Sequence, residues 1–294
     1  MKIGLQRLLN TEDTSSFVKD SYPDNLFITK APLDRIAELA GYTLDDMIAM
    51  NKKFVRAAFW SRTGNQEQMV IENGDAKKCF QSGMTIYFHE LSLARTDEWL
   101  RSVEEDLGLV RGSASLSAFA SSKGPGLPFH WDENANFICQ GWGSKRWRIA
   151  PNRIIKNPSI GHMIHHVPSE RLRVECDGNE IPKVLGPNDV TQTVTMEPGM
   201  VMFMPKGMWH DTETLHDFSF HFNIQTRWTK WSDIIRALVN DTPAPYAEEM
   251  FRSKVPRGMT EDEFFRELGI KLLQLSSSFR DRRIGKNLYS KYVK

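Results

Sequence analysis

The sequence predicts a mainly β protein with flanking helices, built on a jelly-roll (double-stranded β-helix) core with a C-terminal helical appendage. The first observation is a series of short apolar segments between about 113 and 228, separated by Gly, Pro, Asn and Asp. The second is the alternation of apolar and polar residues in "FSFHFNIQ" (218–225). In a jelly-roll barrel, such a strand packs its apolar face outside the sheet and lines a binding cavity with its polar face.

Helical patterns flank this strand-rich stretch on both sides. Thr43 with Asp46 is a helix-start signal upstream, and Thr260 with Glu263 forms a capping box downstream. We therefore expect three regions, listed here in chain order: a helix and strand region at 1–110 that packs on the barrel, the jelly-roll core at 111–228, and a helical region at 229–294.

Composition narrows the class of protein. The chain has 294 residues, with 38 Lys and Arg against 37 Asp and Glu, so nothing in the overall charge favours nucleic acid as a partner. The apolar runs are far shorter than the ~20 residues of a membrane-spanning helix. The N-terminus lacks the apolar core of a secretory signal. Three widely separated cysteines do not indicate a disulfide framework. These features favour a soluble protein of the cytoplasm with no membrane partner.

The segment "LPFHWDENANF" contains a possible half of a metal site. In a strand, residues two apart point to the same side, so His130 and Asp132 converge while Trp131 faces away. One more histidine would complete the two-histidine, one-carboxylate triad that holds non-haem iron and leaves positions open for substrates. Taken alone, His-x-Asp is also compatible with the polar start of a core strand.

The candidate third ligand is His210, in "EPGMVMFMPKGMWHD". A turn, a buried strand and a second Pro/Gly-shaped turn place this histidine where a barrel opens. We expect the remaining candidates to play other roles: a solvated surface loop for His162, His165 and His166, a hairpin turn for His216, and a hydrogen-bonded position inside the cavity for His221.

Three segments together resemble a known family. "HWDENANFICQGWGSKRWRIAP", "PGMVMFMPKGMWHD" and "HFNIQTRW" are similar to the core of JmjC/cupin-type 2-oxoglutarate oxygenases, including the asparaginyl hydroxylase of hypoxia-inducible factor and bacterial ribosomal-protein hydroxylases. The resemblance covers about 25–228. It implies His130, Asp132 and His210 as catalytic Fe(II) ligands, with 2-oxoglutarate as cosubstrate and O₂ as oxidant.

The resemblance also implies residues that bind the cosubstrate. Lys145 matches the cation that pairs with the distal carboxylate. Its strand parity agrees, because Lys145, Trp147 and Ile149 share one face, although a place among the exposed cations of "SKRWR" is the alternative. The other implied contacts are Asn136, Asn223 and Tyr87, the last of which could equally be a core residue.

Two positions depart from the family pattern. Leu127 stands where the family often has a threonine that contacts the cosubstrate, so Ser117 or Ser121 could substitute for it. Gln225 stands where the asparaginyl hydroxylase has a tryptophan, so the resemblance does not extend to the substrate pocket of that enzyme.

The expected activity is hydroxylation of a side-chain carbon in a protein or peptide, with release of succinate and CO₂. Three alternatives remain open at this point: a small-molecule oxygenase, an N-methyl-lysine demethylase, and a metal-binding cupin module without catalysis. The helical region at 229–294 resembles regions that form homodimers or dock substrate.

Overall fold

The computed structural model describes residues 4–51, 54–60, 66–93, 95–241 and 260–278. The helices, with two short 3₁₀ turns, are α1 (Leu5–Leu8), α2 (Ser15–Asp20), η1 (Leu33–Ile36), α3 (Ala37–Ala40), α4 (Leu44–Met50), η2 (Asn73–Asp75), α5 (Ala76–Gln81), α6 (Thr96–Asp106), α7 (Glu170–Glu175), α8 (Trp231–Asp241) and α11 (Glu261–Ser278). The strands are β1 (Phe27–Lys30), β2 (Val55–Trp60), β3 (Gln66–Ile71), β4 (Thr85–Phe88), β5 (Ala114–Pro125), β6 (His130–Trp131), β7 (Ala135–Trp142), β8 (Lys145–Ala150), β9 (His162–Met163), β10 (Gln192–Met196), β11 (Met200–Met204) and β12 (Trp209–Thr226).

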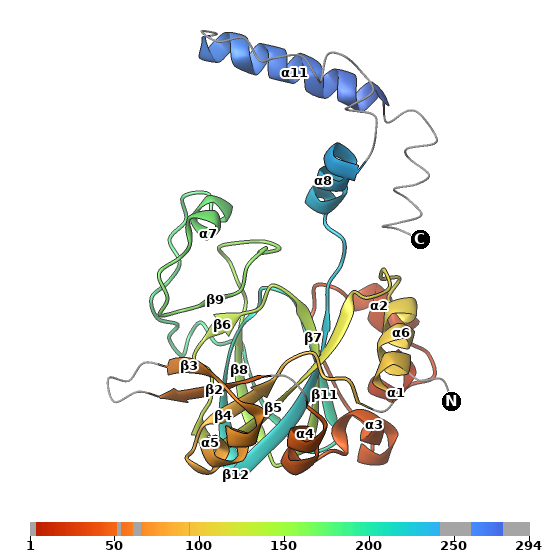
Figure 1. Ribbon diagram of the computed structural model, residues 1–294, viewed down its shortest axis with the longest axis vertical. Helices are drawn as coiled ribbons and strands as arrows, with labels where there is room; N and C mark the ends of the chain where they lie inside the picture. Colours follow the sequence, from red (N-terminus) through yellow and green to blue (C-terminus); the bar gives the residue numbers. More distant parts are fainter. Residues whose placement is uncertain (1–3, 52–53, 61–65, 94, 242–259, 279–294) are drawn as a thin grey trace. The chain divides into compact units, whose positions relative to one another are not determined.

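The chain divides into two compact units. Residues 1–107 and 111–227 make up the first, and residues 108–110 with 228–294 make up the second. The first unit contains every described strand (Figure 1). The division of this unit at residue 110, which the sequence suggests, stays a prediction.

The strands form the two faces of a jelly roll, and the long strand β12 belongs to both. Its first half, 209–214, pairs with β8, which also pairs with β10. Its second half, 218–226, lies between β5 and β7. On this side the strand order is β1-β11-β7-β12-β5-β4-β2-β3, and the described pairs are antiparallel. The mainly β jelly-roll prediction is confirmed.

Alternating side chains explain why these segments are strands. In β8, Lys145, Trp147 and Ile149 are buried, whereas Arg146 and Arg148 lie on the other face. Apolar residues from four strands fill the space between the two sheets, as expected for side chains that alternate across a pleat. This cluster contains Ile138, Trp147, Ile149, Val194, Met196, Met202 and Met204.

Three short strands and one helix were not predicted. Strand β1 has four residues and β9 has two, and β3 is a polar strand at the edge of the sheet. Helix α7 begins after Ser169, whose hydroxyl accepts a hydrogen bond from the Leu172 amide. It belongs to the insertion 151–190, which packs on the outer side of the barrel against Trp131 and Trp209 (Figure 1).

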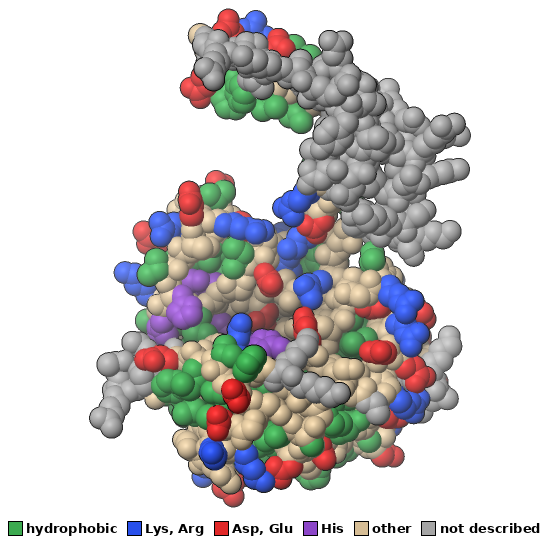
Figure 2. All heavy atoms as spheres, viewed as in Figure 1, with side chains coloured by type: hydrophobic (Ala, Val, Ile, Leu, Met, Phe, Trp, Pro, Cys, Tyr) green, Lys and Arg blue, Asp and Glu red, His purple; other side chains and the backbone are tan. Residues whose placement is uncertain are grey.

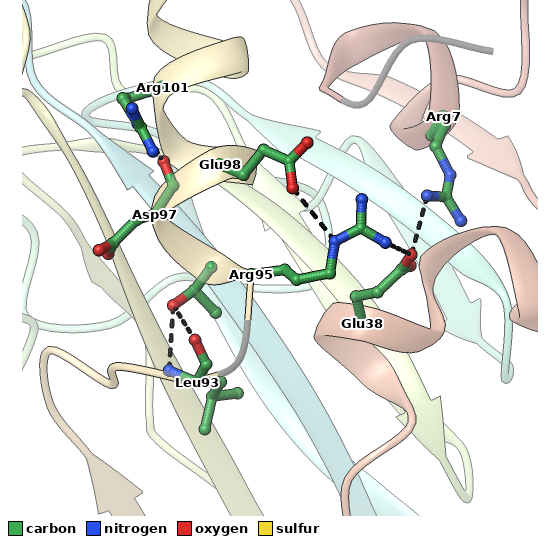
Figure 3. Close-up of polar contacts among 8 residues, drawn as sticks. Arg7, Glu38, Leu93, Arg95, Asp97, Glu98 and Arg101 are labelled. Carbon is green, nitrogen blue, oxygen red and sulfur yellow. Dashed lines mark hydrogen bonds and ion pairs between the residues drawn. The ribbon is translucent and has the colours of Figure 1, made fainter.

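The N-terminal helices pack beside the sheet and are joined by a carboxylate. Glu38 on α3 accepts hydrogen bonds from Arg7 on α1 and from Arg95, each at 3.1 Å (Figure 3). Arg95 adopts a left-handed backbone (φ 65°) just before α6 and also contacts Glu98. The hydroxyl of Thr96, the first residue of α6, contacts the backbone of the preceding turn.

The second unit consists, where described, of helices α8 and α11. The capping box of Thr260 and Glu263 is present at the start of α11, and the Asp233 carboxylate accepts a hydrogen bond from the Lys230 amide at the start of α8. Both helices expose large apolar side chains, among them Trp231 and Phe265. None of the described helices combines the length and the apolar character that crossing a bilayer requires.

Candidate metal centre

The short strand β6 and the beginning of the long strand β12 bring the candidate metal ligands together. His130 in β6 lies directly opposite His210 in β12, and their ring centroids are 4.2 Å apart. Asp132 follows β6 by one residue, and its Oδ2 lies 3.8 Å from Nε2 of His210. One ligand atom from each of the three side chains lies within 4.8 Å of the others. A single ion could therefore contact all three, and within the described residues this is the group that has such geometry.

Backbone carbonyls fix the orientation of both imidazole rings. Nδ1 of His130 lies 2.7 Å from the Pro128 carbonyl oxygen, and Nδ1 of His210 lies 2.9 Å from the Met208 carbonyl oxygen. Because a carbonyl only accepts hydrogen bonds, each Nδ1 carries the proton and each Nε2 keeps its lone pair for a metal. In both histidines, the carbonyl two residues upstream thus fixes the tautomer that leaves Nε2 available to a metal.

The carboxylate ligand is held by an amide. The Asn136 side chain donates a hydrogen bond from Nδ2 to Oδ2 of Asp132 at 2.9 Å. Asn136 is buried at the start of β7, whereas Asp132 keeps more than a third of its side chain exposed. The amide therefore orients the same carboxylate oxygen that lies nearest to Nε2 of His210.

Burial keeps the third ligand in the form that a metal needs. The pKa of His210 falls to about 4, because the ring is desolvated and His130 lies beside it. A neutral imidazole binds metal without first losing a proton. Two neutral imidazoles and a carboxylate suit Fe(II), so the donor set present fits the iron centre that the sequence implies.

The three ligands line a cavity of about 210 Å³ inside the jelly roll. Lys145 lies in the same cavity and is only 2% exposed, which rules out the alternative of a surface cation. Its Nζ donates a hydrogen bond to Ser121 Oγ at 2.8 Å. Burial lowers the pKa of Lys145 to about 7. An ammonium with one neutral acceptor and no described carboxylate partner is suited to an anion that enters the cavity.

A row of aromatic side chains forms the floor of the cavity. Tyr87, Phe119 and His221 are cross-strand neighbours on β4, β5 and β12. The rings of Tyr87 and Phe119 stack at 4.2 Å, and those of Phe119 and His221 at 5.0 Å. Burial and the nearby Lys145 hold the pKa of His221 well below its ordinary value. His221 is therefore a neutral interior histidine, and it is not part of the group of side chains that could hold a metal ion.

The remaining candidates for the cosubstrate also lie in or beside this cavity. Asn223 and Tyr87 line it, and the Oδ1 atom of Asn223 is buried without a hydrogen-bond partner in the described structure. Burial is the main cause that raises the pKa of Tyr87, so this residue stays a neutral phenol. Ser117 is buried but is not part of the lining, whereas Ser121 is, and Leu127 lines the cavity nearby. Contact of these residues with the cosubstrate stays a prediction.

Two expectations about the histidines are wrong. His216 lies within strand β12 and not in a hairpin turn. His162 is buried at 8% exposure, because β9 pairs with β6 and places the ring against the neighbouring rings of Trp131 and Trp209. His165 and His166 are exposed, as expected. Figure 2 shows histidine side chains on one face of the first unit, among interspersed acidic and basic groups.

Sequence reasoning missed one group of cavity residues. Arg56 on β2 and Gln68 on β3 line the cavity, and both strands lie beyond β5 and β4 in the strand order of the sheet. The alternation in "VRAAFW" marks Arg56 as lying on one face of a strand, but it does not say that this face continues the cavity floor.

Comparison with known proteins agrees with this site. The family model for the JmjC domain matches residues 92–234. This part of the chain is a JmjC domain. With its histidine and aspartate ligands in place, the chain is a 2-oxoglutarate-dependent oxygenase of the JmjC type, related to ribosomal oxygenases.

Similar proteins include both bacterial and human examples. The uncharacterised protein YxbC of Bacillus subtilis (strain 168) is 21% identical over 294 residues, which cover 96% of this chain and 83% of YxbC. Human ribosomal oxygenase 1 is 28% identical over 164 residues, 54% of this chain and 23% of that protein. The chain thus spans about a quarter of the human relative. The structure of the Escherichia coli ribosomal oxygenase YcfD with cobalt and 2-oxoglutarate superposes with a TM-score of 0.64 at 14% identity, covering 95% of this chain and 70% of YcfD. At that identity the likeness shows a shared fold.

Proposed function

We propose that the protein hydroxylates a side-chain carbon of a protein or peptide. In the balanced reaction, the C–H bond, O₂ and 2-oxoglutarate give C–OH, succinate and CO₂. Iron held by His130, Asp132 and His210 would supply the O₂ chemistry, which protein side chains do not perform by themselves. The observation that carries the proposal is the meeting of this ligand triad and the buried Lys145 in one cavity.

In this proposal the chain's own residues bind and orient. The Lys145 ammonium pairs with the distal carboxylate of 2-oxoglutarate, and Ser121 holds the ammonium in place. Tyr87 and Asn223 offer hydrogen bonds from the cavity floor. The apolar cluster behind Trp147 excludes water from this end of the site.

A protein substrate is supported by the relatives. Human ribosomal oxygenase 1 and Escherichia coli YcfD carry the name ribosomal oxygenase, which points to a component of the ribosome as substrate in those proteins. We extend this to a ribosomal protein or a peptide-like segment for the present chain, acting in the cytoplasm. The exposed apolar residues on α8 and α11 would serve a homodimer or substrate docking.

The test combines two products in one assay. The purified, Fe(II)-loaded protein is incubated with 2-oxoglutarate and candidate ribosomal proteins, and both succinate and a gain of one oxygen in the protein are measured by mass spectrometry. We expect both signals in parallel, and neither with His130→Ala. Formaldehyde release would instead indicate N-methyl demethylation, and oxidation restricted to a small molecule would indicate the small-molecule alternative. No turnover or binding of 2-oxoglutarate would leave a metal-binding module.

A further inference from the structure

The cavity contains a second cation that the proposed reaction does not use. Arg56 lies on β2 and lines the same cavity as the metal ligands and Lys145. Unlike Lys145 it is exposed. Within the described part of the chain, no ion pair joins Arg56 to an acidic side chain. A guanidinium in a cavity without a carboxylate partner offers its planar set of donors to a ligand.

Strand register shows that the two cations lie at different ends of the cavity. Arg56 pairs with Tyr87, Tyr87 with Phe119, and Phe119 with His221. With neighbouring strands about 4.8 Å apart, the backbone of Arg56 is roughly 14 Å from that of His221. Lys145 bonds to Ser121 on β5 and pairs with Thr214 of β12, so it lies toward the inner end of this row. The exposed Arg56 lies two strands beyond β5, at the outer end. Arg56 is therefore placed where a substrate enters and not where the cosubstrate is held.

The residue paired with Arg56 belongs to the same cavity as the metal ligands. Arg56 on β2 pairs with Tyr87 on β4, and both line the cavity that contains Asp132. Gln68 and Thr85 line the cavity beside Arg56, and both are paired with Ala58 across β2. The small side chain of Ala58 leaves these hydrogen-bonding groups around the guanidinium accessible.

Charge balance decides which substrate side chain suits this site. Among the described residues that line the cavity, the formal charges belong to Arg56, Asp132 and Lys145. The histidine ligands are neutral when they bind metal, and His221 is neutral as well. In the loaded site, the charges of Fe(II) and 2-oxoglutarate cancel, and those of Asp132 and Lys145 cancel. Arg56 leaves one positive charge at the mouth, which repels ammonium and guanidinium groups and attracts a carboxylate.

We propose that Arg56, with Gln68 beside it, recognises an acidic side chain, Asp or Glu, in the substrate segment that enters the cavity. This inference rests on the proposed protein hydroxylation and specifies its substrate class. The guanidinium pairs bidentately with the carboxylate, and the pairing sets the substrate in register with the metal. Arg56 is a specificity-determining residue in this scheme and takes no part in the chemistry.

The test uses peptide libraries that differ only in one fixed position, occupied by Asp, Glu, Asn, Lys or Arg. Binding to the full chain is measured by fluorescence anisotropy with Zn(II) and 2-oxoglutarate, where no turnover occurs, and oxidation is measured by mass spectrometry with Fe(II). The parent protein should bind the Asp and Glu libraries about tenfold or more tightly than the Lys and Arg libraries. Arg56→Gln should remove this preference, and Arg56→Glu should reverse it.

Controls separate recognition from folding and from cosubstrate binding. Arg101→Gln removes the same charge from the exposed face of α6, outside the cavity, and should leave the preference intact. Arg56→Gln should keep the 2-oxoglutarate KM and the melting temperature of the parent, while the KM for the acidic peptides rises. A raised 2-oxoglutarate KM with unchanged peptide binding would overturn the proposal.

The outcomes also distinguish a failure of the role proposed for Arg56 from a failure of the proposed protein hydroxylation. If the parent oxidises peptides but binds the Lys or Arg libraries as well as the acidic ones, the role of Arg56 is wrong and protein hydroxylation stands. If the parent produces succinate with a small molecule and neither binds nor oxidises any peptide library, both proposals are overturned.

Discussion

The two ends of the cavity are built in different ways. At the metal end, His130, Asp132 and His210 come from two short paired segments, and carbonyls two residues upstream orient both rings. At the inner end, Lys145 on β8 meets Ser121 on β5 through side-chain contact between distant strands. Local carbonyl contacts therefore orient the metal ligands that the pairing of β6 with β12 brings together, whereas side-chain packing and desolvation prepare the anion-binding end. Variants at the two ends should separate metal binding from cosubstrate binding.

The largest effect is expected from Asp132→Ala at the metal end. Asp132 is partly exposed, and it is the one acidic side chain among the described residues that line the cavity. Its loss removes a charged metal ligand without opening a void in the core. We expect succinate formation to fall by about 1000-fold, equivalent to ~4 kcal/mol in the barrier, together with loss of stable Fe(II) binding. Isothermal titration with Mn(II) or Fe(II) measures the second effect.

Glu133→Ala is the matched control for this change. Glu133 is the neighbouring acidic residue, and it is exposed and outside the cavity lining. Parent-like metal binding in Glu133→Ala shows that the effect belongs to the ligand position. Retention of full metal affinity in Asp132→Ala would contradict the assigned triad.

The next largest effect is expected from Lys145→Met at the inner end. Methionine keeps most of the buried volume of the side chain and removes the charge. Removal of one member of a buried charge pair costs about 2–5 kcal/mol, so we expect 2-oxoglutarate affinity to fall by roughly 100-fold while metal affinity is unchanged. Lys123→Met, on an exposed position of β5, should behave as the parent. Equal loss of metal and 2-oxoglutarate binding would show that the two ends are not separable.

The contrast between the ends also explains what the sequence could predict. The spacing of two in "HWD" and the strand–turn context of His210 are local patterns, and period-two alternation in β12 and β8 fixes which residues face inward. The buried Lys145 follows from the same parity. The serine that could replace the family's threonine contact with the cosubstrate is left open between Ser117 and Ser121, because both lie on β5 with the same parity and differ only in register along the strand.

What could not be predicted depends on contacts between distant segments. Arg56 enters the cavity because β4 and β2 extend the sheet beyond β5, and this order of strands is not encoded in a local pattern. His162 is buried because the insertion 151–190 returns to pair β9 with β6, although its polar sequence favours a surface loop. In both cases the long-range pairing decides the environment and overrides local polarity.

A smaller effect is expected from Asn136→Ala, which links the two segments of the metal end. The Asn136 amide donates to Asp132 and does not itself belong to the ligand group. Loss of such an orienting hydrogen bond lowers metal affinity by about 10- to 100-fold, and we expect the lower part of this range because Asp132 is partly solvated. Asn136→Asp, which would place a second carboxylate beside Asp132, should weaken metal binding near pH 5 and less so at higher pH. Asn134→Ala, two residues earlier in the chain, is the control. Unchanged metal affinity in Asn136→Ala would contradict the positioning role.

The most diagnostic effect is a pH dependence that belongs to the inner end alone. Burial lowers the pKa of Lys145 to about 7, and a bound dicarboxylate would stabilise the ammonium and raise that pKa again. Binding of 2-oxoglutarate then takes up a proton above pH 7, so its affinity should be level below pH 7 and fall by roughly tenfold per pH unit above it. Calorimetry at fixed Zn(II), in two buffers with different ionisation enthalpies, measures both the affinity and the proton uptake. Lys145→Arg keeps its charge throughout this range and should flatten the profile, whereas Asp132→Asn should leave the slope in place. If 2-oxoglutarate affinity falls with pH as steeply in Lys145→Arg as in the parent, the titrating group is not Lys145. The pH dependence would then not distinguish the anion-binding end of the cavity from the metal end.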